Sequence, residues 1–329
     1  MVMLQTIETR IIIVLIHLFF LNKIGAQSSW TTFKLSTSEL PAPQITTVAP
    51  DNSGNIWVGT SSGLFKFNNN SWNSVETPYE PGKSVNAVKV DPMGNVLVGF
   101  WGGEGLYVYD GINWTSRNGG RGFFVITVIE VDRNDIKWVG SGPFDGGTGL
   151  GKFLEDTVVV YSEWDSELPK NDIRAIAFDK KNNVWVASWH GSGLGLTKFN
   201  HKRWKTYTTS NSELPSNNIT AILVDSKGAL WVGTQDKGIG KLEGKKWSNF
   251  VSLDLQSPHN HVNVLREDEQ GNIWVGTCGG GIIKLSGEEW AFFSTNNSEL
   301  PNDTINALEF DKLGNVWIGT PAGLTKYAQ

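Results

Sequence analysis

The sequence lacks the residues that are typical of proteins stabilised by disulfide bonds, of proteins that bind zinc through cysteines and of proteins that bind nucleic acid. It has one cysteine, Cys278, in 329 residues, which excludes an internal disulfide bond and a cluster of zinc-binding thiolates. Charged residues make up 19% of the chain, the formal net charge is −5, and no long run of lysines and arginines occurs. Without such a run, we expect neither nucleic acid nor an anionic membrane as a partner.

Motifs for common enzyme chemistry are missing as well. The sequence contains no nucleophile elbow, no phosphate-binding loop and no zinc-protease motif. His259 and His261, with Asp254 nearby, have the residue types of a metal site, but a polar loop explains them equally well. We expect no cofactor and no metal, and we favour a binding protein over an enzyme.

Long hydrophobic runs are also absent. The longest apolar stretch, Ile11–Leu21, has 11 residues and follows Arg10. A membrane-spanning helix needs about 20 apolar residues, whereas this length is typical of a secretory signal peptide. We predict a signal peptide over residues 1–26 and one domain over 27–329, located in the periplasm or secreted. An uncleaved anchor is the alternative, because Glu8 offsets the charge of Arg10.

The chain is rich in glycine and tryptophan, with 37 and 15 residues, and it repeats itself. Seven times an Asp is followed six residues later by an apolar anchor and, two residues further, by a small residue. The anchors are Trp57, Leu97, Trp138, Trp185, Trp231, Trp274 and Trp317. Repeats of about 40 to 45 residues that combine turn residues with β-formers are typical of β-propellers. We therefore predict an all-β fold, a seven-bladed β-propeller of four-stranded blades.

The repeated residues are interpreted as scaffold. Each Asp leads a turn in which its carboxylate accepts backbone N–H groups, and the Gly, Asn or Asp three residues later tolerates a positive φ. Each anchor is expected to fill space between neighbouring blades, and Leu97 suggests that bulk is required there rather than the indole nitrogen. Seven equivalent aspartates are not a catalytic set.

The last repeat is incomplete. The chain ends at Gln329 after the third strand of the seventh blade, while residues 30–33 read as a fourth strand without a blade. We predict that residues 28–35 pair with the C-terminal blade, so that the N-terminal strand closes the ring and removes its open edge.

The repeats resemble those of a known family in their amino-acid sequence. Glu-Leu-Pro-Ser-Asn-Asn-Ile at 213–219 and Gly-Asn-Ile-Trp-Val-Gly-Thr at 271–277 are similar to repeats of the two-component regulator propeller family, and the likeness covers residues 30–327. In that family such propellers are periplasmic sensor parts of hybrid histidine kinases, many of which respond to products of polysaccharide breakdown. Here the sequence shows a single propeller and no recognisable kinase, so the resemblance implies the fold and a ligand-binding role, not kinase activity.

The blades differ from one another mainly in their loops. The connections between the second and third strands are longest in blades 2 to 4. The connections entering blades 2, 3 and 6 lack the repeated Ser-Glu-Leu-Pro, and the one entering blade 4 has Trp164 where others have Ser or Asn. All of these connections are expected on one face of the disc. The candidate ligand-binding residues are Trp101, Glu104, Arg117, Arg121, Phe144, Asp145, Trp164, Trp189 and His190.

Aromatic planes beside charged groups suit sugars, because rings stack on their apolar faces and charged groups bind hydroxyls. We therefore predict a monomeric, exported propeller that binds an oligosaccharide, another small molecule or a partner protein on this face. Three alternatives remain open. The long loops pack only on themselves; the protein is a lyase or hydrolase similar to streptogramin lyases, with His190 or His259 as base assisted by Glu104 or Asp145; or it is a scaffold of the cell envelope.

Overall fold

The computed structural model describes residues 28–34, 44–68, 71–103, 105–117, 125–142, 147–155, 157–190, 192–250 and 260–329. The predicted signal peptide lies outside these ranges. Within them the chain forms 28 β-strands, and no helix is long and apolar enough to cross a membrane.

The strands follow one another as antiparallel meanders, here called blades and numbered along the chain. Blade 1 holds β2 (Ile45–Pro50), β3 (Ile56–Thr60), β4 (Gly63–Asn68) and β5 (Ser71–Val75). Blade 2 holds β6 (Val85–Val90), β7 (Val96–Phe100), β8 (Leu106–Tyr109) and β9 (Trp114–Arg117). Blade 3 holds β10 (Ile126–Val131), β11 (Lys137–Ser141), β12 (Leu150–Phe153) and β13 (Val158–Tyr161). Blade 4 holds β14 (Asp172–Phe178), β15 (Val184–His190), β16 (Ser192–Phe199) and β17 (Trp204–Tyr207).

The remaining blades complete the ring. Blade 5 holds β18 (Ile219–Val224), β19 (Leu230–Thr234), β20 (Ile239–Glu243) and β21 (Lys246–Phe250). Blade 6 holds β22 (Val262–Glu267), β23 (Ile273–Thr277), β24 (Ile282–Ser286) and β25 (Glu289–Phe293). Blade 7 holds β26 (Ala307–Phe310), β27 (Val316–Thr320), β28 (Gly323–Ala328) and, from the other end of the chain, β1 (Ser29–Phe33).

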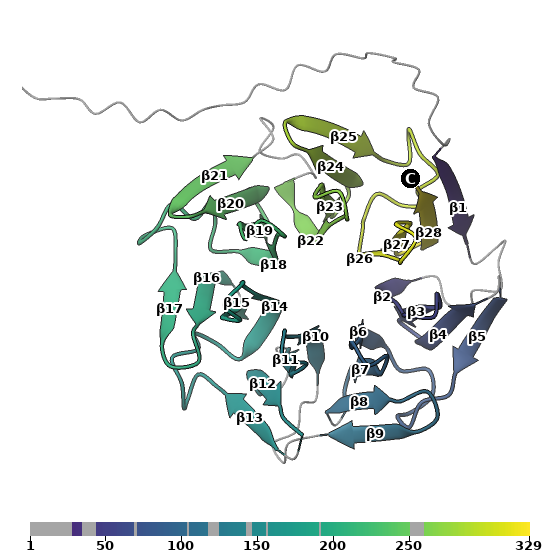
Figure 1. The fold of residues 1–329 in the computed structure, drawn as a ribbon, viewed down its shortest axis with the longest axis horizontal. Helices are drawn as coiled ribbons and strands as arrows, with labels where there is room; N and C mark the ends of the chain where they lie inside the picture. Colours follow the sequence, from purple (N-terminus) through teal and green to yellow (C-terminus); the bar gives the residue numbers. More distant parts are fainter. Residues whose placement is uncertain are drawn as a thin grey trace, which may run out of the picture.

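These strands form five four-stranded sheets and one eight-stranded sheet. The large sheet consists of blades 3 and 4, which are joined by a single parallel pair between Ser141 and Asp172. Counted as meanders, the described strands therefore make seven blades, arranged as a ring with the first strand of each blade innermost (Figure 1). The predicted β-propeller is confirmed.

The ring closes as predicted. β1 pairs antiparallel with β28, with Trp30 opposite Tyr327 and Phe33 opposite Leu324. The Trp30 ring lies 4.5 Å from that of Tyr327, and Phe33 stacks on Trp317 at 6.2 Å. Two ends of the sequence thus share one blade, and β1 covers the edge of β28 that would otherwise be unpaired.

The repeated Asp and Trp residues interact within each blade. In five blades the indole Nε1 donates to the Asp carboxylate at 2.9–3.0 Å, in the pairs Asp51–Trp57, Asp132–Trp138, Asp225–Trp231, Asp268–Trp274 and Asp311–Trp317. The expectation that only bulk matters at the anchor is therefore wrong for these five blades, where the ring nitrogen holds the turn, whereas the buried Nε1 of Trp185 in blade 4 has no hydrogen-bond partner among the described residues. The positive φ expected three residues after each Asp is present even at Asp135 (61°) and Asn182 (62°).

These hydrogen bonds make stability depend on pH. Burial alone would raise the pKa of Asp268, but hydrogen bonds from Trp274 and Asn272, with Lys284 nearby, hold it below its ordinary value of 3.8. The pKa values of Asp51 and Asp179 are lowered in the same way, against burial, by hydrogen bonds to their carboxylates. A carboxyl with a lowered folded pKa contributes stability above its unfolded pKa and loses it as the pH falls through the folded pKa.

We expect Asp268→Asn to lower the free energy of unfolding by about 2 kcal/mol at pH 7, because the amide nitrogen turns one acceptor into a donor. Urea unfolding at pH 7 and pH 3 checks this. The difference from the wild type should shrink below about pH 4, where the carboxyl of the unfolded wild-type chain becomes protonated before that of the folded protein. An equal difference at both values would contradict the account.

In blade 2 the turn Asp has no Trp anchor to bind and is paired with a cation instead. Here Leu97 replaces Trp, and Val108 stands opposite it, where the six other blades place a Lys Nζ 4.7–5.6 Å from the Trp ring. The fully buried Asp91 side chain instead meets Lys137 of blade 3 at 3.2 Å. Lys137 occupies a position that is aliphatic in the other repeats, so blade 3 supplies the cation that blade 2 lacks.

Lys137→Met is expected to destabilise the protein by about 2–3 kcal/mol, because it leaves a buried carboxylate without its counterion. In an Asp91→Asn background the same change should cost less than about 1 kcal/mol, since the charge is already gone. Urea unfolding of the four proteins in this cycle measures the coupling. Equal costs in both backgrounds would show that Lys137 does not act through Asp91.

Candidate functional site

The two faces of the disc are built from different connections. Each inner strand starts on the face that carries the connections between blades and the loops between second and third strands, here called the loop face. The turns between first and second and between third and fourth strands lie on the opposite face, here called the turn face. The inner strands surround a central cavity of about 180 Å³.

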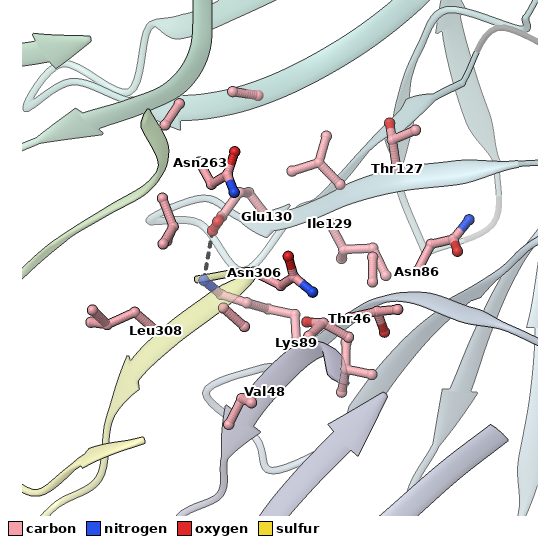
Figure 2. A pocket seen from close by; sticks show the side chains of 18 of the residues that line it. Thr46, Val48, Asn86, Lys89, Thr127, Ile129, Glu130, Asn263, Asn306 and Leu308 are labelled. Carbon is pink, nitrogen blue, oxygen red and sulfur yellow. Dashed lines mark ion pairs between the residues drawn. The ribbon is translucent and has the colours of Figure 1, made fainter. Parts of the chain in front are cut away.

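A ring of polar side chains marks the loop-face end of this cavity. Each comes from the second residue of the Ile- or Val-led inner segment, next to an irregularity in the pairing with the second strand in six blades. The ring consists of Thr46, Asn86, Thr127, Arg174, Thr220, Asn263 and Asn306. Figure 2 shows five of them, with Val48, Ile129 and Leu308 lining the cavity beyond.

Five ring residues link neighbouring blades. The side chain of each donates to the first inner-strand carbonyl of the next blade: Asn263 to Ile305 at 3.0 Å, Asn306 to Ile45 at 2.8 Å, and Thr46, Thr127 and Thr220 to the carbonyls of Val85, Ile173 and Val262. These donors are occupied in holding the ring together, so they are structural.

Asn86 of blade 2 and Arg174 of blade 4 do not make this link among the described residues. Asn86 accepts a hydrogen bond from Ser84 of its own blade at 3.3 Å, which leaves its amide nitrogen available. Arg174 contacts Asp172 at 3.3 Å, and its side chain is 42% exposed. The Arg174 guanidinium also lies 5.4 Å from the ring of Trp189, a distance typical of a cation–π contact.

Two tryptophans stand beside these unlinked positions. Trp101 and Trp189 each follow the anchor of their blade by four residues, and the equivalent residue of the blade between them is Gly142. Trp101 is 46% exposed, and its backbone is held by a hydrogen bond to Ser84 at 2.9 Å. Trp189 pairs with Asp172 in β14. Blades 2 and 4 thus present an indole and an unlinked donor each, on either side of a small residue.

The other predicted site residues are not seen in contact with the polar ring in the described part of the chain. Trp164 is 72% exposed in the connection from blade 3 to blade 4. Arg117 lies at the end of an outer strand, where its Nη1 donates to the carbonyls of Leu154 and Glu155 at 2.9 and 2.8 Å. Glu104, Arg121, Phe144 and Asp145 lie outside the described residues, and of His190 only the backbone in β15 is described.

The sequence reasoning missed Asn86, Asp172 and Arg174. The loops of the blades differ in length, whereas the inner strands differ only in single residues. Aligned on the first inner residue, the seven repeats read Thr, Asn, Thr, Arg, Thr, Asn and Asn at the next position. The single Arg in that column was the available signal.

The turn-face end of the cavity is chemically different. There Lys89 pairs with Glu130 at 2.7 Å (Figure 2), and Arg266 pairs with Glu309 at 2.6 Å. Charges at this end are matched between neighbouring blades, whereas at the other end Arg174 and Asn86 keep donors for which the described residues provide no partner. The loop-face end is therefore the better entrance for a polar ligand.

A histidine lies elsewhere on the loop face. His261 of blade 6 accepts at its backbone carbonyl from Cys278 at 2.9 Å. Burial lowers the pKa of its imidazole, and the charge of Asp236 partly opposes this. Near neutral pH the ring is therefore uncharged, the form that a general base needs.

Comparison with family models identifies five matching segments. Residues 39–62, 167–190, 213–236, 256–279 and 299–322 match the family described as two component regulator propeller. They belong to blades 1, 4, 5, 6 and 7, so the repeats of blades 2 and 3 lie outside the matched segments. A comparison with curated proteins finds no match.

Solved structures with the same fold come from different proteins. An extracellular domain of the hybrid two component system BT3049 from B. thetaiotaomicron is similar with a TM-score of 0.78 and 21% identity, over 92% of this chain and 41% of that one. A catalytically inactive virginiamycin B lyase from Staphylococcus aureus, with quinupristin, gives 0.72 and 12%, over 92% and 100%. PorZ, a surface component of the type-IX secretion system of Porphyromonas gingivalis, gives 0.68 and 18%, over 90% and 48%. At these identities the likeness establishes the fold, and the chain spans about two fifths of the two-component structure.

Proposed function

Because the chain carries two component regulator propeller repeats, we propose that it is an exported sensor-type propeller that binds a small ligand on its loop face at blades 2 to 4. One observation carries this proposal. The two ring positions that do not link blades, Asn86 and Arg174, belong to the two blades that present Trp101 and Trp189.

The chemistry of this sector favours an oligosaccharide. Indole planes stack on the apolar faces of sugar rings, while guanidinium and amide donors bind hydroxyl oxygens. Arg174 is held over Trp189 and beside Asp172, which fixes the direction of its remaining N–H groups. A site held in place before binding loses less entropy when the ligand arrives.

The cellular role follows the same reasoning. The signal-like segment over residues 1–26 favours export to the periplasm or the outside, and the extracellular two-component domain with the same fold agrees with that location. That propeller is part of a longer chain. We propose that ligand binding occurs here and that the signal leaves through another protein of the envelope.

A thermal-shift screen of oligosaccharides against the purified protein tests binding. Ligand at 100 times its dissociation constant stabilises the folded state by about 2.7 kcal/mol, which corresponds to a shift of several degrees for a domain of this size. A screen in which no saccharide shifts the melting temperature would contradict a sugar as the ligand.

A lyase is the second candidate function. Lyase propellers have the same fold over nearly their whole length, and His261 near Asp236 offers a neutral base on the loop face. Under this reading, replacing His190, His259 and His261 with Ala abolishes turnover of a substrate. Under the binding proposal, the same replacements leave ligand affinity largely unchanged.

A further inference from the structure

The turn face carries a group of cations that the sequence does not show as a run. Eight lysines and arginines stand exposed in the turns of blades 3, 4 and 5: Arg133, Lys180, Lys181, Lys202, Arg203, Lys227, Lys245 and Lys246. They occur singly or in pairs along the chain, and the ring brings their turns to one side. The expectation of no anionic membrane partner was based on the absence of a run of cations in the sequence, which does not show cations that the fold brings together.

Hydrogen bonds and side-chain packing join most of these turns into one surface. The backbone of Arg133 donates to Asn182 of the next blade at 3.3 Å. His201, beside Lys202, lies 2.7 Å from the carbonyl of the same Asn182. The side chain of Lys180 lies against Gly228 of blade 5, where an added Cβ would be 3.1 Å from its Cε. The cations of blades 3 to 5 thus form a continuous basic patch.

Several carboxylates beside this patch bind other groups, while the exposed Glu155 lies in the blade 3 turn on the same face. Asp179 binds Asn183 and Lys198, Glu243 pairs with Lys241 at 3.3 Å, and Glu267 accepts from Ser226. Among the described residues, none of the eight cations forms an ion pair. The patch therefore keeps its positive charge in a protein whose formal net charge is −5.

The same face also presents apolar tips. Met93, Ile112 and Leu313 stand in turns of blades 2 and 7 and are 79%, 84% and 86% exposed. Single exposed apolar side chains are common on protein surfaces, but at a bilayer they gain free energy by entering the headgroup region. Turn tips on one face of a disc reach a flat surface together.

The chain also enters the disc from this side. Ser29 begins β1 opposite Ala328 at the end of β28, and the neighbouring Gln329 bonds to the carbonyl of Gly314 in the turn of blade 7. Leu313 belongs to that same turn. Ser29 therefore lies on the turn face.

We propose that the turn face is a docking surface for an anionic lipid bilayer. Phosphate headgroups would meet the basic patch, Leu313 and Met93 would enter the interface, and the loop face would point away from the membrane with its ligand site open. A basic patch holds anionic headgroups by charge, so binding weakens as salt screens it. This proposal does not depend on the identity of the ligand.

Sedimentation with lipid vesicles tests it. The full chain is mixed with vesicles of phosphatidylglycerol and phosphatidylcholine or of phosphatidylcholine alone, so that the N-terminal segment is the same in every sample. We expect stronger binding to the anionic vesicles, and release from them at high salt. Lys180→Gln with Lys181→Gln should lower the partition coefficient by about 10- to 30-fold, while Lys83→Gln with Lys237→Gln, on the loop face, should leave it unchanged.

Several outcomes would overturn the proposal. Equal binding to both kinds of vesicle, or equal losses in the two double variants, would remove the role of the basic patch. Retention on immobilised polyglutamate without binding to anionic vesicles would assign the patch to an acidic protein instead. Circular dichroism of each variant confirms that a loss reflects charge and not unfolding.

Discussion

Deletion of residues 28–34 is expected to abolish cooperative folding of the propeller. β1 supplies the fourth strand of blade 7, and its loss exposes the backbone edge of β28 along the whole pairing from Ser29 to Phe33. It also removes Trp30 from Tyr327 and Phe33 from Trp317. Large-to-small changes at packed Trp or Phe residues cost about 3–5 kcal/mol each. The free energy lost with the whole strand is therefore comparable to the free energy of unfolding of a domain.

Urea unfolding followed by tryptophan fluorescence measures this effect. The deleted protein should show no cooperative transition or should aggregate through its open edge, while a Thr31→Ala control should unfold almost as the wild type does. A synthetic peptide of residues 27–37, added in excess, should restore the transition. A soluble deletion variant with an unchanged midpoint would contradict closure by this strand.

The second large effect concerns the ligand site. Replacing Trp101 and Trp189 together with Ala should weaken binding of any saccharide found in the screen by at least about 100-fold, since central aromatic residues in binding sites contribute about 2 kcal/mol or more each. Arg174→Gln alone should weaken it by roughly 10-fold, because hydrogen bonds to charged groups contribute about 1.5–3 kcal/mol. Isothermal titration calorimetry on each variant checks both values.

A matched control separates this effect from a general loss of aromatic surface. Phe292 of β25 is 40% exposed, close to the 46% of Trp101, but belongs to an outer strand of blade 6. Phe292→Ala should leave the affinity unchanged. A ligand that still binds normally after Trp101, Trp164 and Trp189 are all replaced would remove blades 2 to 4 as the site.

Periodic features of the molecule could be predicted from the sequence. The Asp-to-anchor spacing and the orphan strand at residues 30–33 were enough for the blades and for their closure, because each blade repeats the same local contacts. Leu97 misled the interpretation of the anchor, since the substitute cation Lys137 comes from another blade. Lys137 stands out in a column that is otherwise aliphatic, but only the fold shows that its partner is Asp91 of the neighbouring blade.

The candidate site was predicted only in part. Subtracting the common residues pointed to blades 2 to 4, and the inner strands supply independent support through Asn86 and Arg174. Asn86 and Arg174 stand out because the other five ring residues form hydrogen bonds between blades. Those hydrogen bonds are visible only in the structure. The basic patch was missed for a similar reason, because turns far apart in sequence, such as those at Arg133 and Lys227, become neighbours only when the ring forms.

A crystal structure of the protein with the best saccharide from the thermal-shift screen tests the central claim most directly. We predict density for the ligand on the loop face, in contact with the indoles of Trp101 and Trp189 and within hydrogen-bonding distance of Arg174 or Asn86. Density confined to another sector, such as the surroundings of His261 and Asp236, would contradict it.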